Sequence, residues 1–185
     1  MIFEEQYIKG IFKVTLSPYI DNRGAFARLF CEEEFSKAGI PFSCKQVNQS
    51  FTKEKGSFRG IHYQFGAFAE WKLIRCLQGS VLDFGVDLRK NSSTLFKSFS
   101  IELSEDNHTM LLLPPGVGHA FQTLKENTAL IYFHSSFYNS KYEGGIKFDD
   151  PKIQLNLPLE ITNLSERDNN HPFINTDFTG IDYEM

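Results

Sequence analysis

The feature that most constrains the fold is a series of short segments in which apolar and polar residues alternate, with turn residues between them. In residues 81–88 (VLDFGVDL), Leu82 and Phe84 fall on one face and Asp83 and Gly85 on the other, which is the period of a β-strand. Further candidate strands with this character are 71–77, 96–103, 109–113 and 128–137. Their spacing predicts an all-β antiparallel sandwich or barrel. The turn Gln78-Gly79-Ser80 predicts a tight hairpin between 71–77 and 81–88.

Two short helices are predicted in addition to the strands. Residues 31–40 (CEEEFSKAGI) have an acidic first turn and a glycine near the end, which is typical of a helix and its stop signal. Ser165 can cap a second helix, with Asp168 three residues further on. The length suits a single domain over residues 1–185, and from about residue 169 we expect a polar, Asn-rich tail that packs loosely.

Composition and charge narrow the possible partners and compartment. The 19 Phe and 7 Tyr residues favour β structure. The net charge is -4 with no basic block, so we expect no nucleic-acid partner, and an anionic ligand would need local positive charge. The three cysteines suggest reduced thiols. No signal sequence and no run of ~18 apolar residues is found, which predicts a cytoplasmic protein without a membrane partner.

Residues 58–64 (FRGIHYQ) place an arginine, a glycine and a histidine inside an apolar stretch. In a regular strand His62 and Arg59 point to opposite faces, which predicts a core histidine and a surface arginine. A bulge at Gly60 would instead bring both side chains to one cavity, because glycine permits the local twist. Both interpretations remain open from this segment alone.

Three other polar residues stand in apolar surroundings. Lys72 shares a strand face with Ile74, so it is either buried against an anion or exposed on an edge strand. Tyr132 lies in an apolar strand, where its hydroxyl needs a partner or it is simply packed in the core. The turn PPGVGHAF (114–121) delivers His119 either into a barrel mouth or to the surface.

The same region also contains candidate metal ligands. The candidate ligands are His62, Glu70 and His119, with Gln64 where a second histidine would complete a His-x-His pair. Scattered candidates with one amide are a weak set for a transition metal, so no bound metal is predicted.

The order and spacing of many segments between residues 21 and 168 resemble those of the dTDP-4-dehydrorhamnose 3,5-epimerase family. The matching segments are DNRGAF, QVNQS, FRGIHYQ, KLIRCLQGSVLDFGVDLRKNS, IELSEDN, PPGVGHAF, LIY, YEGGIKFDDP and LSERD. The resemblance implies a cupin jelly-roll barrel with a few short helices. It also implies an enzyme without metal or cofactor that inverts carbons 3 and 5 of a nucleoside-diphosphate-linked 4-keto-6-deoxy sugar, on the route to L-rhamnose. A homodimer is implied as well, and the apolar segment IFKVTL (11–16) suits strand pairing across its interface.

The resemblance assigns roles to particular residues. His62 resembles the base, Asp168 the carboxylate that orients it, Lys72 the cation that stabilises the enolate, and Tyr132 the acid. The histidine pKa of ~6.5 suits a base at working pH, and an ammonium in a dry cavity suits an enolate. The implied substrate-binding residues are Arg23 and Arg59 for the diphosphate, with Phe26, Gln46, Asn48, His119, Tyr138 and Glu143.

Some positions depart from the family pattern. Arg28 stands where a glutamate usually contacts thymine, Trp71 stands where a small residue is common and would narrow the sugar pocket, and Val117-Gly118 replace Phe and Ala. The nucleotide, the sugar and the number of inverted carbons therefore stay open. The alternatives are an epimerase acting at carbon 3 or carbon 5 alone, a metal-dependent cupin such as an oxygenase or isomerase, and a non-catalytic sugar-nucleotide binder.

Overall fold

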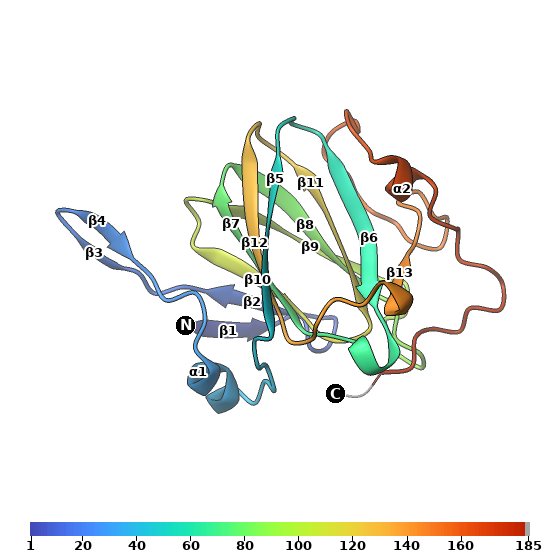
Figure 1. The fold of residues 1–185 in the computed structure, drawn as a ribbon, viewed down its shortest axis with the longest axis horizontal. Helices are drawn as coiled ribbons and strands as arrows, with labels where there is room; N and C mark the ends of the chain where they lie inside the picture. The colour runs from blue at the N-terminus through green and yellow to red at the C-terminus, as the bar shows by residue number, and fades with distance from the viewer. Residues whose placement is uncertain (184–185) are drawn as a thin grey trace.

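Two antiparallel β-sheets face each other and form a barrel in the computed structural model, which describes residues 1–183 (Figure 1). The six-stranded sheet has the order β1 (Ile2–Glu5), β2 (Phe12–Thr15), β10 (Thr109–Leu113), β7 (Lys72–Gln78), β12 (Thr128–His134), β5 (Gln46–Thr52). The five-stranded sheet has the order β13 (Glu143–Gly145), β6 (Phe58–Gln64), β11 (Val117–Thr123), β8 (Ser80–Asp87), β9 (Ser98–Ser104). The predicted all-β cupin architecture is confirmed.

The turn at Gln78-Gly79-Ser80 does not form the predicted hairpin. β7 pairs with β10 and β12, whereas β8 pairs with β11 and β9, so the turn carries the chain from one sheet to the other. Gly79 has a φ of +75°, and a Cβ there would lie 2.5 Å from Thr128 Oγ1. Because glycine readily adopts a positive φ, Gly79 is compatible with a turn that connects two sheets as well as with a hairpin.

Two strands are shorter in the structure than the sequence predicts. The strand expected from residue 96 begins at Ser98, because Phe96 has a φ of +66°, outside the β region. The strand expected to reach residue 137 ends at His134, where its partner β5 has its first residue, Gln46.

β8 is buried on both faces, although its alternating sequence also fits a half-exposed strand. Phe84 and Val86 pack in a cluster with Ile146, Ile153 and Ile181 from the C-terminal part of the chain. The opposite face carries Asp83, which is fully buried between the sheets. The outer face of the five-stranded sheet is thus covered by a long segment with little regular structure, seen in orange and red in Figure 1.

The polar tail is held against the barrel, so the expectation of loose packing from residue 169 is wrong for the described residues. The backbone N–H of Lys147 donates to the carbonyl of Pro172, and that of Ile174 donates to Asp150 Oδ2. Ile181 is 8 % exposed and its N–H donates to Leu88. Apolar residues spaced along a polar segment are sufficient to dock it.

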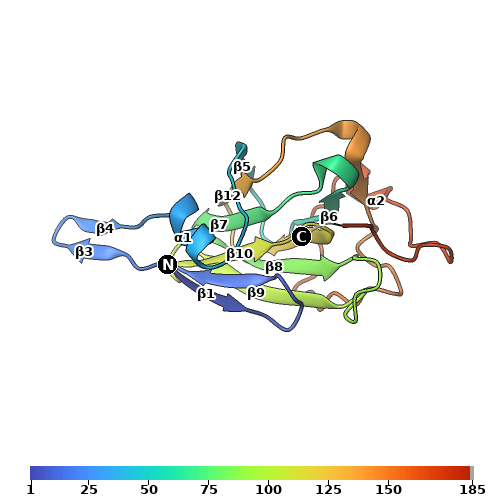
Figure 2. The same cartoon turned by 90° about the horizontal axis from the view of Figure 1, so that it is seen from below.

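The N-terminal part adds a helix and a projecting hairpin. Helix α1 (Glu32–Lys37) buries Phe35 in a cluster with Trp71 at the side of the six-stranded sheet. The hairpin of β3 (Tyr19–Asp21) and β4 (Gly24–Phe26) extends away from the barrel in both Figures 1 and 2. The segment IFKVTL is not available for pairing with another chain, because β2 already pairs with β1 and β10.

Three further short elements complete the described chain: 3-10 helices η1 (Gly66–Phe68) and η2 (Ser140–Tyr142), and helix α2 (Glu166–Asn169). Both predicted α-helices are present. Within residues 1–183, no helix is long and apolar enough to cross a membrane.

Candidate active site

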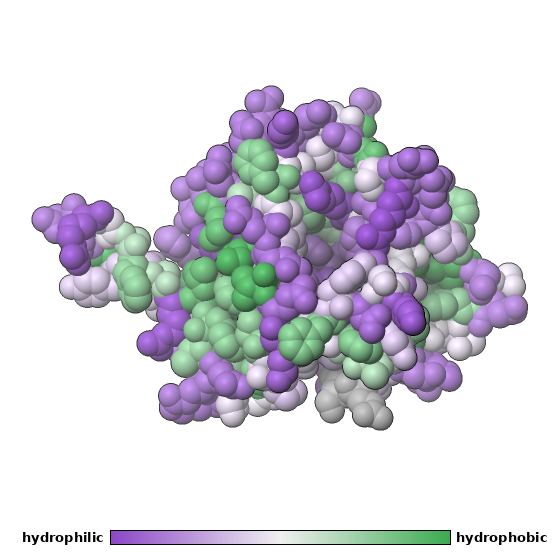
Figure 3. Space-filling model, viewed as in Figure 1, coloured by the Kyte–Doolittle hydropathy of each residue, from purple (hydrophilic) through white to green (hydrophobic). Residues whose placement is uncertain are grey.

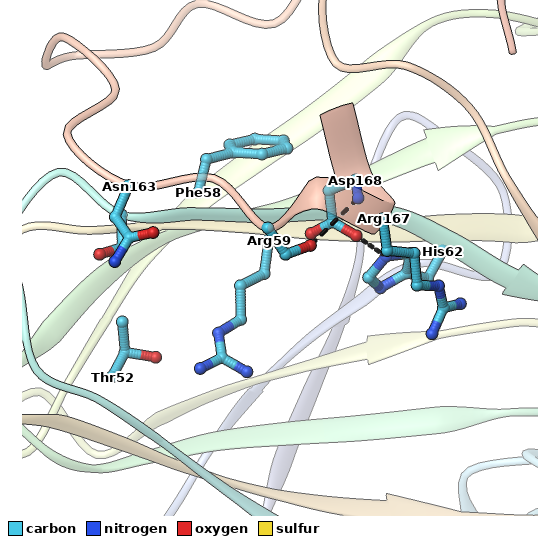
Figure 4. Close-up of a pocket in the computed structure, with 9 residues that line it drawn as sticks. Thr52, Phe58, Arg59, His62, Asn163, Arg167 and Asp168 are labelled. Carbon is cyan, nitrogen blue, oxygen red and sulfur yellow. Dashed lines mark hydrogen bonds and ion pairs between the residues drawn. The ribbon is translucent and has the colours of Figure 1, made fainter. Parts of the chain in front are cut away.

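Of the two interpretations left open for residues 58–64, the structure has the bulge at Gly60 in β6. His62 is opposite His119 and Arg59 is opposite Phe121, so two residues of β6 face the single residue between them on β11. Gly60 has a φ of +136°, and a Cβ there would lie 2.3 Å from the Cβ of Ala120. As a result Arg59 and His62 line the same cavity of about 300 Å³, instead of pointing to opposite faces (Figure 4).

Asp168, to which the family resemblance assigns the orienting role, is hydrogen-bonded to His62. The Ser165 hydroxyl accepts from the backbone N–H of Asp168, as predicted for a capped helix, and this places the carboxylate against β6. His62 Nε2 lies 2.7 Å from Asp168 Oδ1, and the Gly60 N–H donates to Oδ2 at 3.3 Å (Figure 4). Burial would raise the pKa of Asp168, but the hydrogen bond and charge of His62, with the Gly60 N–H, hold this pKa below its usual range. Nδ1 of His62 remains available to accept a proton.

Lys72 lies in a second cavity, of about 180 Å³, which His62 also lines. Its side chain is 14 % exposed and its Nζ is 3.4 Å from Glu70 Oε1, so the buried alternative holds and Glu70 supplies the anion. Glu70 Oε2 also accepts from His134 Nδ1 at 2.9 Å. Burial would raise the pKa of Glu70, but the charges of Lys72 and His134 lower it overall. The same cavity is lined by four predicted substrate-binding residues, Gln46, Asn48, Tyr138 and Glu143.

Tyr132 projects from β12 in the sheet opposite to the one that carries His62. Its hydroxyl lies 2.9 Å from the Ser50 hydroxyl, and its ring stacks on His134, which lines the Lys72 cavity. Burial raises the pKa of Tyr132 far above its usual value, so the phenol keeps its proton across the physiological range.

His119 forms a second histidine–carboxylate pair, within the barrel. His119 Nε2 lies 2.9 Å from Asp83 Oδ1, and both side chains are buried, so the surface alternative for His119 is wrong. Burial raises the pKa of Asp83 and lowers that of His119. His119 lines neither cavity; its ring stands 5.9 Å from that of Tyr132, edge to face.

A sequence profile described as dTDP-4-dehydrorhamnose 3,5-epimerase matches residues 5–176. The chain belongs to the dTDP-4-dehydrorhamnose 3,5-epimerase family. The enzyme of that name from Sinorhizobium fredii is 36% identical over 173 residues, which are 93% of this chain and 89% of the relative. Family membership makes the chain an isomerase.

Solved structures of the family have the same fold. A dTDP-4-dehydrorhamnose 3,5-epimerase from Bacillus anthracis with TDP and PPi bound has a TM-score of 0.90 and 31% identity, covering 94% of this chain and 99% of its own. A 3'-monoepimerase from Streptomyces bikiniensis in complex with dTDP-quinovose has a TM-score of 0.85 and 31% identity, covering 91% of this chain and 86% of its own.

Two predicted substrate-binding residues of this epimerase lie away from His62. Arg23 and Phe26 are on the projecting β3–β4 hairpin and line a separate cavity of about 240 Å³. Arg23 pairs with Asp21 at 2.6 Å, and Phe26 is 77% exposed. Within one chain, the structure therefore does not bring these two residues to the site.

Two of the departures from the family pattern also lie outside the two cavities that His62 lines. Trp71 packs in the cluster around Phe35, so the expectation that it narrows the sugar pocket is wrong. Arg28 is 2.8 Å from Glu34 at the start of α1. Lys72 and Trp71 are adjacent in sequence, and adjacent side chains point to opposite faces.

Arg167 is a site residue that sequence reasoning missed. It lines the Arg59 cavity (Figure 4). Its guanidinium pairs with Glu143 Oε1 at 2.5 Å. Its signal was its position beside Asp168 in the LSERD segment. Figure 3 shows polar residues gathered over β6 and α2, where the two arginines lie.

His171 was missed because it falls in the tail that was expected to be loose. It follows Asp168 by three residues, just beyond the end of α2 at Asn169, and its Nε2 lies 3.6 Å from Asp168 Oδ1. Its ring stands 5.4 Å from that of His62. Burial and the charge of His62 lower the pKa of His171.

His62, Glu70 and His119, the candidate metal ligands from the sequence, do not form one cluster. Glu70 pairs with Lys72 and His134, and His119 pairs with Asp83. Among residues 1–183, the group of potential ligand atoms within 4.8 Å of one another is that of His62, Asp168 and His171.

Proposed function

We propose that this chain is a cofactor-independent epimerase that removes and returns protons beside the ketone of a nucleoside-diphosphate-linked 4-keto-6-deoxy sugar. The observation that carries this proposal is that His62 and Tyr132 come from facing sheets, while Lys72 lines a cavity that His62 shares. Inversion needs a base on one side of the ring and an acid on the other. A sugar between the sheets would meet both.

The proton transfers follow from the hydrogen bonds. His62 donates Nε2–H to Asp168, so its Nδ1 takes the proton from the carbon next to the ketone. The electron pair of the broken C–H bond moves to the ketone oxygen, and the Lys72 ammonium stabilises the resulting enolate. Tyr132 then gives its proton to the opposite face of the same carbon. Proton exchange with water returns His62 and Tyr132 to their starting states.

Charge and hydrogen-bonding groups around His62 suit a sugar nucleotide. Arg59 and Arg167 can bind the diphosphate, since guanidinium groups match phosphate oxygens. Gln46, Asn48, Tyr138 and Glu143 line the Lys72 cavity. There the amides can bind sugar hydroxyls, and Glu143 with Tyr138 can contact the nucleotide. We propose dTDP-4-dehydro-6-deoxyglucose as the substrate and dTDP-4-dehydrorhamnose as the product.

A second candidate is an epimerase that inverts one carbon only. The 3'-monoepimerase from Streptomyces bikiniensis shares 31% of its residues with this chain, the same fraction as the Bacillus anthracis 3,5-epimerase. The residues that position the ring in the cavity decide between one centre and two.

The assembly that we propose is a homodimer in which the β3–β4 hairpin of each chain reaches the partner. The hairpin carries Arg23 and Phe26 away from the His62 of its own chain, and it exposes Tyr19 and Ile20, each 69% exposed. Figure 3 shows hydrophobic residues on the face next to this hairpin. Sedimentation velocity at micromolar concentration should give a dimer, and Phe26→Asp should shift it to the monomer. A wild-type monomer would contradict this assembly.

The compartment that we propose is the cytoplasm. All three cysteines are free, and burial raises the pKa of Cys76 to about 11. Free thiols persist in a reducing compartment.

The proposed reaction is tested by proton NMR in deuterium oxide. The purified enzyme, treated with a chelator, is incubated with thymidine-, uridine- and guanosine-linked 4-keto-6-deoxy sugars. Deuterium should appear at carbons 3 and 5 of the thymidine-linked sugar, with the configuration of dTDP-4-dehydrorhamnose in the product. Exchange at a single carbon would select the second candidate, and exchange that stops on chelation would contradict a metal-free mechanism.

A further inference from the structure

His171 places a second imidazole beside the His62–Asp168 pair. Its Nε2 is 3.6 Å from Asp168 Oδ1, is buried, and has no hydrogen-bond partner within residues 1–183. A buried imidazole nitrogen without a partner is unusual, because burial of an unpaired polar group costs free energy. We propose that His62, Asp168 and His171 form a binding site for a divalent transition-metal ion of the Zn²⁺ type, and that the bound ion inhibits the enzyme.

The ligand set and distances suit such an ion. Two imidazoles and one carboxylate are common zinc ligands, at about 2.0–2.2 Å from the metal, which puts tetrahedral ligand atoms ~3.4 Å apart. The distance of 3.6 Å between His171 Nε2 and Asp168 Oδ1 is already close to this value. The 2.7 Å between His62 Nε2 and Asp168 Oδ1 must open by roughly 0.7 Å, since a hydrogen bond is replaced by two metal bonds.

The His171 ring is fixed where a metal would need it. A Cβ on Gly145 would lie 2.1 Å from Cε1 of His171, so β13 packs directly against the ring. On another side the ring meets that of His62 edge to face. The ligand atoms of all three residues lie within 4.8 Å of one another, so one ion can reach them after small side-chain shifts.

The two arginines near Asp168 are engaged with other partners. Arg167 is already paired with Glu143, and the Asp168 carboxylate is 4% exposed. Arg59 lines the same cavity, but its guanidinium donates to the carbonyl of Phe51 at 3.3 Å. Asp168 therefore supplies the negative charge that a divalent ion requires.

Metal binding would remove the basic nitrogen of His62. A neutral imidazole has one N–H and one lone pair. In the free enzyme the N–H is Nε2, bonded to Asp168, and the lone pair is on Nδ1. An ion on Nε2 uses the lone pair there, and the displaced proton moves to Nδ1, which then accepts no proton from the sugar. This inhibitory step rests on the proposed role of His62 as base, whereas binding of the ion does not.

Binding is tested by titrating zinc chloride into the metal-free full-length chain in a calorimeter. The wild type should bind one ion per chain, and His171→Gln, which keeps a polar group of similar size, should weaken binding by at least about tenfold. The matched control is His108→Asn, because His108 has a φ of +51° that asparagine tolerates and it is outside the three-residue group. Equal binding by wild type and His171→Gln, or no binding by wild type, would overturn the site.

Inhibition is tested with the same variants by deuterium exchange. Saturating Zn²⁺ should reduce exchange by wild type and by His108→Asn about tenfold or more, with recovery on adding a chelator. His171→Gln should lose less than about half of its own zinc-free exchange rate under the same conditions. Zinc that activates the wild type, or inhibits His171→Gln equally, would overturn the proposal. Zinc binding that depends on His171 in a protein inactive on every sugar would support the site and overturn the proposed function instead.

Discussion

Two histidine–carboxylate pairs are built on neighbouring strands of the five-stranded sheet and differ in their surroundings. His62 and His119 are partners in the register of β6 and β11, and their bonds to Asp168 and Asp83 measure 2.7 and 2.9 Å. The His62 side chain is 29% exposed, whereas that of His119 is 7% exposed. Only His62 borders the two cavities.

The carboxylates of the two pairs differ in the direction of their pKa shifts. Hydrogen bonds and positive charge lower the pKa of Asp168 despite its burial, and complete burial raises the pKa of Asp83. A carboxylate that stays ionised can stabilise the imidazolium that forms when a base takes a proton. The His62–Asp168 pair therefore suits a catalytic base. The His119–Asp83 pair, made of the same residue types, suits a buried structural element that packs against Tyr132.

The largest expected effect separates the two histidines. His62→Gln should reduce deuterium exchange by about a thousandfold and leave the fold intact, because it removes the base. His119→Ala should instead lower the free energy of unfolding by about 3 kcal/mol, since it leaves Asp83 buried without its partner. Exchange kinetics and urea denaturation measure the two effects. A urea midpoint of His119→Ala equal to that of the wild type would contradict this distinction between the two histidines.

The next effect concerns the acid opposite His62. Tyr132→Phe should reduce formation of the inverted product by about three hundredfold. Exchange should fall less, because His62 can still remove a proton and return it to the same face. NMR of the substrate pool measures both rates at once. Equal losses of exchange and inversion would assign Tyr132 to binding or folding.

Replacing the carboxylates should reveal opposite pH dependences of stability. Asp168 has a lowered pKa in the folded state, so its stabilisation is present above the unfolded pKa and is lost as the pH falls through the folded pKa. Asp83 has a raised pKa, so its contribution is complete below the unfolded pKa and is lost as the pH rises through the folded pKa. Asp168→Asn should therefore cost most stability near neutral pH, and Asp83→Asn should become relatively more stable than wild type as the pH rises.

Urea denaturation between about pH 3 and 8 measures these slopes. Asp168→Asn should also reduce exchange by about a hundredfold, because His62 loses its charged partner. Parallel slopes for the two variants would show that both carboxylates have the same charge state in the fold.

The smallest expected effect concerns binding of the substrate diphosphate by Arg59. Arg59→Lys keeps the charge but loses the forked geometry, so KM should rise by about tenfold with kcat nearly unchanged, the equivalent of one charge-assisted hydrogen bond. Arg59 belongs to neither histidine–carboxylate pair, so Arg59→Lys should leave the free energy of unfolding unchanged. Steady-state kinetics over substrate concentration provide the test, and a loss confined to kcat would contradict the assignment to binding.

Local sequence patterns predicted those parts of the site that depend on strand alternation. Gly60 offered the bulge that brings Arg59 beside His62 as one of two interpretations, and the apolar neighbours of Lys72 offered its burial as one of two; the structure has both. Strand alternation puts Trp71 on the face opposite Lys72, where it packs with Phe35, whereas the resemblance implied a place in the sugar pocket. There the local pattern was the better guide.

Features that depend on distant contacts were not predictable in the same way. A glycine with positive φ serves a tight hairpin and a crossing between sheets equally, so Gly79 did not distinguish the two. His171 and Arg167 acquire their roles only when the segment after residue 164 packs on β6. The place of Arg167 beside Asp168 was a local signal, but no local pattern encodes the packing itself.

The bond between His62 and Asp168 joins residues that are 106 positions apart, and Asp168 is near the end of the chain. During synthesis on the ribosome the strands that carry His62, Lys72 and Tyr132 emerge well before the segment that supplies Asp168. A nascent chain can thus assemble most of its barrel while its histidine still lacks an orienting partner. The orienting partner of His62 is added only when the segment after residue 164 docks on β6.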